Sequence, residues 1–234
     1  MYTTDSTNIA VYNHLMKVAK EIALTNPKGL PDLIRAILRP LQSEHLLAVA
    51  ERGQDALPNL DGAWFFGSAV RDRLFSTSGS RWLGRPLPQN QYVLKLSRDI
   101  VLPWPWSLRG YVSALATIGS AKAPVAMSQT STRPYSRNYQ GPWVQDDNHS
   151  VHLWLPWGIG FVYGGNHSIA AGILAGEGEV IPEKVYDMSH LLDSLHCDGA
   201  YFYETDNGEK VEAVTDVRRA AVFEIGRLMG AQHS

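Results

Sequence analysis

The feature that most constrains this chain is a 29-residue stretch, residues 148–176, that contains no Lys, Arg, Asp or Glu. So long a stretch without charge is typical of a buried core or of a membrane span. This one contains three histidines, two asparagines, one proline and six glycines, which are unsuited to a helix that must stay regular across a bilayer. We therefore expect a buried sheet core here and no membrane span.

The chain has 234 residues, enough for one domain with an appendage or for two small domains. Apolar residues at helical spacing predict a helical N-terminal region and an arm over residues 1–83, in which Pro40 is expected to end a helix. Alternating and Gly-rich segments predict strands and helices over residues 84–204. The Asp-Asn-Gly turn at 206–208 predicts a hairpin that ends within residues 205–234 and leads into a C-terminal helix. The expected fold class is α/β.

Cysteine usage indicates the redox environment. Cys197 is the only cysteine, so the chain can form neither an internal disulfide nor a four-cysteine zinc site. The first 20 residues have neither a basic start nor an apolar run, so no signal peptide is expected. These patterns fit a reducing cytoplasm.

Charge is unevenly placed along the chain, although the net charge is only −2. Residues 71–140 carry 10 basic and 2 acidic side chains, whereas residues 141–216 carry 2 basic and 13 acidic ones. Either the basic segment forms a track for a polyanion beside a carboxylate-rich site, or the two segments neutralise each other in the fold. The sequence leaves both alternatives open.

The sharpest local motif is a strand, then Gly164, Gly165, Asn166, His167 and Ser168, then a helix. Two glycines let the backbone turn tightly and approach a ligand, and the start of a helix offers N–H groups and a positive dipole end. Together these features predict a phosphate site at the turn. The motif lacks the lysine of a P-loop and the spacing of a dinucleotide fingerprint. The alternative is that the glycines only turn the chain and Asn166 caps the helix.

Three segments within residues 91–190 resemble a known superfamily. Residues 163–172 (YGGNHSIAAG) resemble the G-G-C-H-R-x-x-A turn of sulfiredoxins and the G-x-H-R-x-x-A turn of ParB-like domains. Residues 180–187 (VIPEKVYD) are similar to the strand that follows that helix, and residues 99–106 (DIVLPWPW) to the first strand with its Pro-rich exit. The resemblance implies a ParB/sulfiredoxin-like mixed sheet that binds a nucleotide, with ATP as the implied cofactor.

Two departures from that superfamily limit its chemistry. Asn166 stands where sulfiredoxins have their nucleophilic cysteine, so we expect no sulfinic acid reductase activity. Ser168 stands where the family has a phosphate-binding arginine, which leaves the backbone N–H groups as the main phosphate ligands. Arg133 or Arg137, which belong to another loop, could replace that arginine as a phosphate ligand.

Within the superfamily, the Asn-His-Ser version of the turn, the extra N-terminal helices and the tryptophan-rich core are most similar to plasmid fertility-inhibition factors. This similarity implies a bacterial, plasmid-encoded cytoplasmic protein that suppresses conjugative transfer of another plasmid or of T-DNA. The implied partners are the conjugation coupling machinery or the relaxase–DNA complex. Some members are associated with ATPase and DNase activity.

Cations and aromatic rings alternate at Arg133, Tyr135, Arg137 and Tyr139. Guanidinium groups can neutralise phosphates while rings stack on unpaired bases, so this run could bind single-stranded DNA. The alternative is a surface loop whose rings pack on the core.

Asp146, Asp147 and His149 form a compact group of carboxylates and an imidazole. The two carboxylates could hold Mg²⁺ or Mn²⁺ and, with His149, catalyse phosphodiester hydrolysis. This interpretation predicts a metal-dependent DNase or nucleotide hydrolase that degrades the transferring strand. The alternative is an acidic, solvated turn before a strand.

Overall fold

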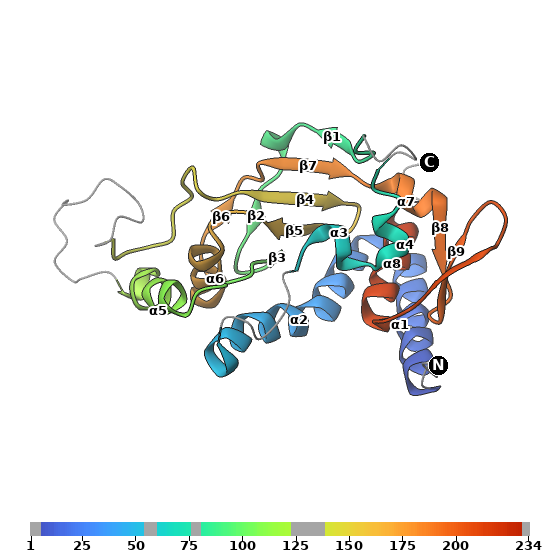
Figure 1. Cartoon of the computed structure of the whole chain (residues 1–234), viewed down its shortest axis with the longest axis horizontal. Helices are drawn as coiled ribbons and strands as arrows, with labels where there is room; N and C mark the ends of the chain where they lie inside the picture. Colours follow the sequence, from blue (N-terminus) through green and yellow to red (C-terminus); the bar gives the residue numbers. More distant parts are fainter. Residues whose placement is uncertain (1–5, 54–59, 76–80, 123–138, 231–234) are drawn as a thin grey trace.

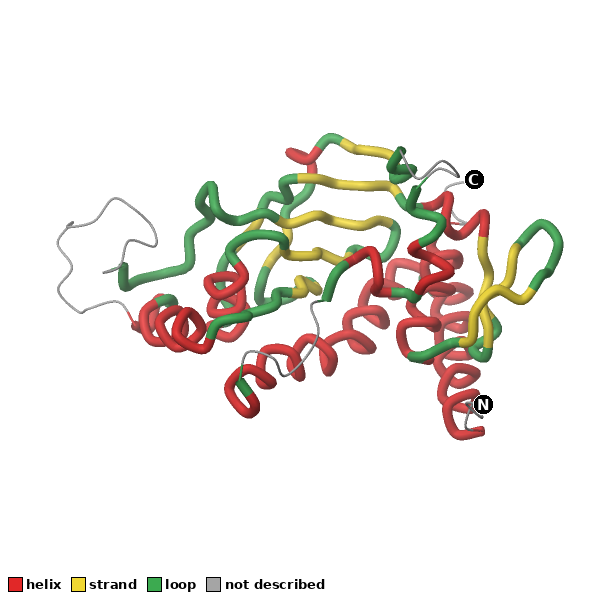
Figure 2. Tube along the Cα trace, viewed as in Figure 1, coloured by secondary structure: helices red, strands yellow, loops and turns green. Residues whose placement is uncertain are grey.

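The structure, a computed structural model, describes residues 6–53, 60–75, 81–122 and 139–230. A mixed sheet flanked by helices makes up the described chain, which confirms the expected α/β class (Figure 1, Figure 2). None of the helices in these ranges has both the length and the apolar character that a membrane crossing requires.

The main sheet has five strands in the order β1-β7-β4-β5-β3. It is mixed, because β3 runs parallel to β5 and β4 parallel to β7, while β4 is antiparallel to β5 and β1 to β7. The strands span Arg85–Leu87 (β1), Ile100–Leu102 (β3), Val151–Leu155 (β4), Ile159–Val162 (β5) and Lys184–Asp187 (β7). All four residues of β5 are buried, so the uncharged stretch does form the sheet core.

Two smaller sheets lie beside the main one. The first pairs β2 (Leu94–Lys95) with β6 (Glu179–Val180). The second joins β8 (Leu195–Cys197), β9 (Tyr201–Glu204) and β10 (Lys210–Ala213) in antiparallel order. Its β9–β10 connection is the expected hairpin, and Gly208 takes the left-handed conformation there, with φ +71°.

Three helices pack together beneath the sheet: α1 (Ser6–Thr25), α2 (Leu30–Arg52) and α8 (Val217–Gly230) (Figure 1). The expectation that Pro40 ends a helix is wrong, because α2 continues through it to Arg52. A proline inside a helix costs about 3 kcal/mol. Apolar side chains of α2 are buried on both sides of it, such as Leu38 and Leu46, and their burial offsets that cost.

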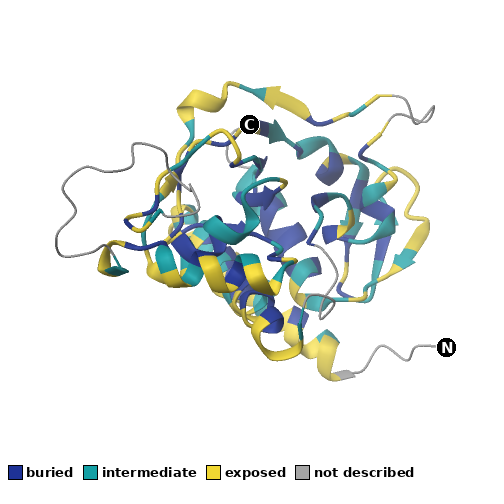
Figure 3. Cartoon of the chain, turned by 60° about the vertical axis from the view of Figure 1, so that its left-hand side comes forward, coloured by how far each residue is buried: buried dark blue, intermediate teal, exposed yellow. Residues whose placement is uncertain are grey.

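One hydrophobic core unites the three segments expected from the sequence. It contains Leu38 from α2, Trp154 and Phe161 from the sheet, and Phe223 from α8. Figure 3 shows buried residues concentrated in the middle of the molecule, where the sheet meets the helices. The N-terminal and C-terminal helices are therefore packed on the sheet and on each other.

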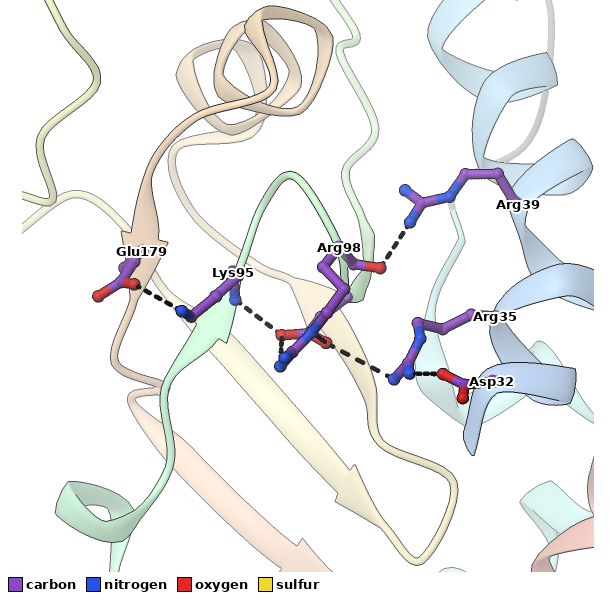
Figure 4. Close-up of polar contacts among 7 residues, drawn as sticks. Asp32, Arg35, Arg39, Lys95, Arg98 and Glu179 are labelled. Carbon is purple, nitrogen blue, oxygen red and sulfur yellow. Dashed lines mark hydrogen bonds and ion pairs between the residues drawn. The ribbon is translucent and has the colours of Figure 1, made fainter. Parts of the chain in front are cut away.

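A buried carboxylate attaches α2 to the start of β3 (Figure 4). Asp99 accepts hydrogen bonds from the backbone N–H of Lys95 at 2.8 Å and from Nε of Arg98 at 2.9 Å. Arg35 of α2 lies 3.8 Å from the same carboxylate, and Arg39 donates to the carbonyl of Arg98. These contacts fix β3, whose far end leads into the candidate site.

The helices α5 (Leu108–Thr117) and α6 (Asn166–Ala175) pack on each other at one end of the sheet (Figure 1). Helix α6 follows directly from β5, so a buried strand fixes the position of its first turn. The remaining short elements are α3 (Gly62–Phe65), α4 (Ser68–Arg71), α7 (Ser189–Ser194) and the 3-10 turns η1 (Pro27–Gly29), η2 (Gln89–Gln91) and η3 (Ser120–Lys122).

Candidate functional site

The Gly164-Gly165 turn connects an interior strand, β5, to the first residue of α6, as the sequence predicted. Gly165 has φ +74°, in the left-handed region that favours glycine. A Cβ on Gly164 would lie 2.4 Å from the carbonyl oxygen of Asn148, and one on Gly165 would lie 2.4 Å from Cδ2 of His149. Both positions therefore require glycine, because a side chain at either would collide with its neighbour.

The start of α6 has no side-chain cap of its own. Gly165 is the capping residue and has no side chain to offer. The Oδ1 of Asn166 instead accepts a hydrogen bond from the backbone N–H of Trp104 at 2.7 Å. The first N–H groups of a helix have no partner within the helix, and they carry the positive end of its dipole. This arrangement suits an anion.

A pocket of about 540 Å³ opens at this helix start. The turn forms one wall, α5 forms the opposite one, and the exposed ring of Trp106 (53% exposed) stands beside them. No Lys, Arg, Asp or Glu is among its described lining residues, so no carboxylate there repels an anion. The lining consists of Trp106, Gly110, Ser113, Ala114, Thr117, Ile118, Tyr139, Asn148, Tyr163, Gly164, Gly165, Asn166, His167 and Ser168.

His167 is held between the turn and the N-terminus of α5. Its Nε2 accepts from the backbone N–H of Ser107 at 3.1 Å, and its ring lies edge-on to Trp106 with centroids 5.2 Å apart. Burial lowers the pKa of His167. The ring is therefore neutral at pH 7, with its proton on Nδ1 because Nε2 is the acceptor.

Asp146, His149 and Ser168 form a continuous chain of contacts behind the turn. Nδ1 of His149 lies 2.8 Å from Oδ1 of Asp146 and also 2.8 Å from the backbone N of Asp146. Its Nε2 lies 2.6 Å from Oγ of Ser168, which is 2.9 Å from the carbonyl oxygen of Gly165. The imidazole is fully buried, and this burial lowers the pKa of His149 against the charge of Asp146, which acts to raise it.

The structure joins two of the three residues expected to be catalytic. Asp146 and His149 are in contact, while Asp147 is exposed in the neighbouring turn. Among the residues that the structure describes, no three His, Cys, Asp or Glu side chains are arranged to hold a metal ion. Both ring nitrogens of His149 already face protein atoms, so Mg²⁺ or Mn²⁺ at Asp146 and Asp147 stays a prediction without support from ligand geometry.

Of the expected DNA-binding run, Arg133, Tyr135 and Arg137 lie outside the described residues. Tyr139 is described: it lines the pocket, and its hydroxyl donates to the carbonyl of Pro142. DNA binding by this run stays a prediction.

The two oppositely charged segments do neutralise each other at several points. Arg73 pairs with Glu204, Arg85 with Asp187, and Lys95 with Glu179 at 3.6 Å. Figure 4 shows the last of these pairs beside the Asp99 cluster. For these three pairs, the contacts support the interpretation that the basic and acidic segments neutralise each other in the fold.

Sequence reasoning missed the contact between His149 and Ser168 and the place of Trp106 beside the pocket. A spacing of three residues between Asp146 and His149 was a readable signal for that pair, because such residues approach each other in a tight turn. Nothing in the sequence links His149 to a residue 19 positions later.

The chain matches the model of a protein family over residues 2–233. That family is described as a family of unknown function, DUF6710. No curated protein and no solved structure matches the chain. Because the family match spans nearly the whole sequence, the chain belongs to the DUF6710 family.

Proposed function

We propose that this protein binds a phosphate-bearing ligand in the pocket at the start of α6. The observation that carries the proposal is the Gly164-Gly165 turn, which presents an uncapped helix N-terminus to a pocket lined by no carboxylate among the described residues. Backbone N–H groups and the helix dipole favour a phosphate there. His167, which is neutral, is part of the same wall and adds no negative charge to it.

The ligand we propose is a nucleotide. An exposed indole, Trp106, stands at the pocket and can stack on a base while the phosphates occupy the turn. The resemblance to ParB/sulfiredoxin-like proteins supports the same assignment, and we propose that fold for residues 84–204. Because the described pocket lining has no lysine or arginine, we expect micromolar affinity at best.

The variant Asn166→Asp tests phosphate binding without removing a contact. An aspartate retains the acceptor for the N–H of Trp104 and adds a negative charge at the first position of α6. Such a charge favours the helix but repels a phosphate, at about 1 kcal/mol for charges about 4 Å apart in water. We expect the affinity for ATP and for pyrophosphate, measured by calorimetry, to fall at least about fivefold, with no loss of thermal stability.

Asn207→Asp is the matched control. Its Oδ1 also accepts a backbone N–H, from Glu209 at 2.7 Å, but it lies in the β9–β10 hairpin and not in the pocket lining. This variant should bind both ligands as the wild type does. Equal affinity of the wild type and Asn166→Asp, or no binding of either ligand at millimolar concentration, would contradict the proposal.

For the cell, we propose that the protein suppresses conjugative or T-DNA transfer by acting on the coupling machinery or the relaxase–DNA complex. The support is the similarity of its turn and its extra N-terminal helices to fertility-inhibition factors. Expression in donor cells should lower the transfer frequency of a conjugative plasmid, and Asn166→Asp should restore it. Unchanged transfer of several unrelated plasmids would exclude this role for them.

A further inference from the structure

The contacts of Ser168 have the geometry of an activated nucleophile. Its Oγ lies 2.6 Å from Nε2 of His149, and Nδ1 of the same ring lies 2.8 Å from a carboxylate oxygen of Asp146. A hydroxyl, an imidazole and a carboxylate in this order form the array that converts serine into a nucleophile on unrelated folds. Ser168 also lines the pocket in which the phosphate is proposed to bind.

We propose that Ser168 attacks the phosphorus of a phosphate ester bound at the Gly164–Ser168 turn, with His149 as the general base and Asp146 orienting its ring. The proposal rests on the proposed function for the position of the phosphate. It names a reaction that needs no metal ion, and it assigns the nucleophile to the residue that replaces the arginine of the similar superfamily.

The tautomer of His149 decides whether Ser168 can be activated. Two groups of Asp146 lie 2.8 Å from Nδ1: the backbone N–H, which needs a lone pair there, and the carboxylate, which needs a proton. A hydrogen bond to a carboxylate is the stronger of the two, so it favours the proton on Nδ1. Nε2 then carries the lone pair that accepts the proton of Ser168. The carbonyl of Gly165, at 2.9 Å from Oγ, is the competing acceptor.

The substrate phosphate has donors beside the nucleophile. Ser168 is the third residue of α6, and helical side chains lean toward the helix N-terminus, where the first N–H groups lie. Those N–H groups can hold the non-bridging oxygens of the phosphate while charge builds on them. Phosphate binding and nucleophilic attack therefore use one turn of backbone.

The reaction balances with water as the only co-reactant. Oγ of Ser168 forms a bond to phosphorus, its proton passes to Nε2 of His149, and the bond from phosphorus to the ester oxygen breaks. His149 then protonates the departing alkoxide. In the second half, water attacks the phosphoserine, His149 takes its proton, and Ser168 leaves with that proton. The net change is hydrolysis of the ester, with no oxidation or reduction.

Trapping with a fluorophosphonate tests the proposal, because this probe presents a phosphorus electrophile to an activated serine. The full-length protein is incubated with the probe in EDTA, and the adduct is mapped by mass spectrometry. We expect one adduct, at Ser168, that is absent from urea-unfolded protein. In parallel, metal-free protein should release p-nitrophenolate from bis(p-nitrophenyl) phosphate.

Three variants separate chemistry from packing. Ser168→Ala should lose both signals. His149→Asn keeps a polar side chain beside Asp146 but removes Nε2, so labelling at Ser168 should slow by about 100-fold or more. Ser194→Ala is the matched control: its hydroxyl also donates to a helix carbonyl, that of His190 at 2.7 Å, and neither signal should change.

The failures of the two proposals are distinguishable. ATP or pyrophosphate binding without an adduct at Ser168 would overturn the nucleophile and leave the binding function standing. Turnover that survives in Ser168→Ala, or equal labelling in His149→Asn, would also overturn it. Because the first readout is the wild-type adduct, the proposal stays falsifiable even if a variant fails to fold.

Discussion

The pocket at α6 and the pocket between α1 and α8 have the same size, about 540 Å³ each, but opposite chemistry. The α1–α8 pocket is lined by five charged side chains: Lys17, Lys20, Glu21, Glu224 and Arg227. The described lining of the α6 pocket has no Lys, Arg, Asp or Glu. Volume alone therefore does not identify a site in this molecule.

In the α1–α8 pocket, the buried polar atoms hold helices in place. Glu224 accepts from the backbone N–H of Cys197 at 2.8 Å and from Nε of Arg227 at 2.8 Å. Arg227 also donates to the carbonyls of Leu192 and Leu195, and the hydroxyl of Tyr12 donates to that of Cys197. These bonds connect α1, α7, β8 and α8, so their purpose is structural.

In the α6 pocket, the hydrogen bonds lie behind the ligand surface and orient it. Asn166 is held by Trp104, His167 by Ser107, and Ser168 by His149. The five residues of the turn, 164–168, are only partly buried. The comparison predicts that changes in the first pocket cost stability and that changes in the second cost binding.

The largest expected effect on stability is that of Glu224→Ala. The change removes the partner of Arg227 and of a buried N–H, and breaking a buried ion pair costs about 3–5 kcal/mol. Because Arg227 is partly exposed, with 34% of its side chain accessible, we expect about 3 kcal/mol in urea unfolding. Glu209→Ala, in the exposed hairpin, should change stability by less than about 0.5 kcal/mol. An equal loss of stability in Glu224→Ala and Glu209→Ala would contradict the structural role of the α1–α8 pocket.

Gly165→Ala should affect both stability and binding. Alanine would have to adopt φ +74° and place its Cβ 2.4 Å from His149, which we expect to cost about 2–3 kcal/mol. The change should also abolish ATP binding, because it displaces the turn. Gly176→Ala isolates the backbone strain: it has φ +70° at the other end of α6, with no atom within 4 Å, and should cost about 1 kcal/mol without loss of binding. Binding lost equally in both variants would contradict the assignment of the turn.

Whether a feature of this fold could be predicted from the sequence depends on how far apart along the chain the contacting residues lie. The Gly-Gly turn, the β9–β10 hairpin and the buried uncharged stretch follow from local patterns, and the structure confirms each of them. Cys197 is buried, and burial raises the pKa of its thiol to about 12, which makes it unreactive. The turn, the hairpin and the uncharged stretch each depend on a few adjacent residues.

The contacts that define the candidate site are long-range and were not predictable. Asn166 meets the N–H of Trp104 62 positions away, and Trp106 reaches the pocket from the segment before α5. The continuation of α2 through Pro40 has the same origin, because the buried contacts that offset the proline come from other elements. The intrinsic preferences of neighbouring residues could not reveal the site contacts or the continuation of α2, since tertiary packing decides them.

A smaller effect, dependent on pH, is expected at Glu177, which attaches the wall of the α6 pocket to the end of α6. Its carboxylate accepts from the backbone N–H groups of Ser120 at 3.0 Å and Trp143 at 2.8 Å. Burial acts to raise the pKa of Glu177, but these hydrogen bonds and the charge of Lys122 lower it below its usual value. The unfolded chain therefore binds the proton more tightly, and the stabilisation is present above the unfolded pKa and lost as pH falls.

We expect Glu177→Gln to cost about 1 kcal/mol at pH 7 in urea unfolding. The difference from the wild type should shrink as the pH falls below the usual glutamate pKa, about 4.3, and vanish once the folded-state carboxyl is protonated. Glu179→Gln is the control, because its exposed pair with Lys95 at 3.6 Å contributes little. A cost for Glu177→Gln that is constant with pH would show that the carboxylate charge does not hold this wall.

The smallest expected effect on stability is that of Trp106→Ala, and it gives the sharpest test of the comparison. The ring is about half exposed, so its removal should change the free energy of unfolding by about 0.5 kcal/mol or less. If the ring stacks on a base, ATP affinity should fall about five- to tenfold, since stacking contributes about 1 kcal/mol. Pyrophosphate has no ring and should bind unchanged. Trp64→Ala, with similar exposure (54%) but outside the pocket, should affect neither ligand. An equal loss for ATP and pyrophosphate in Trp106→Ala would mean that the indole positions His167, which it contacts edge-on, and does not receive a base.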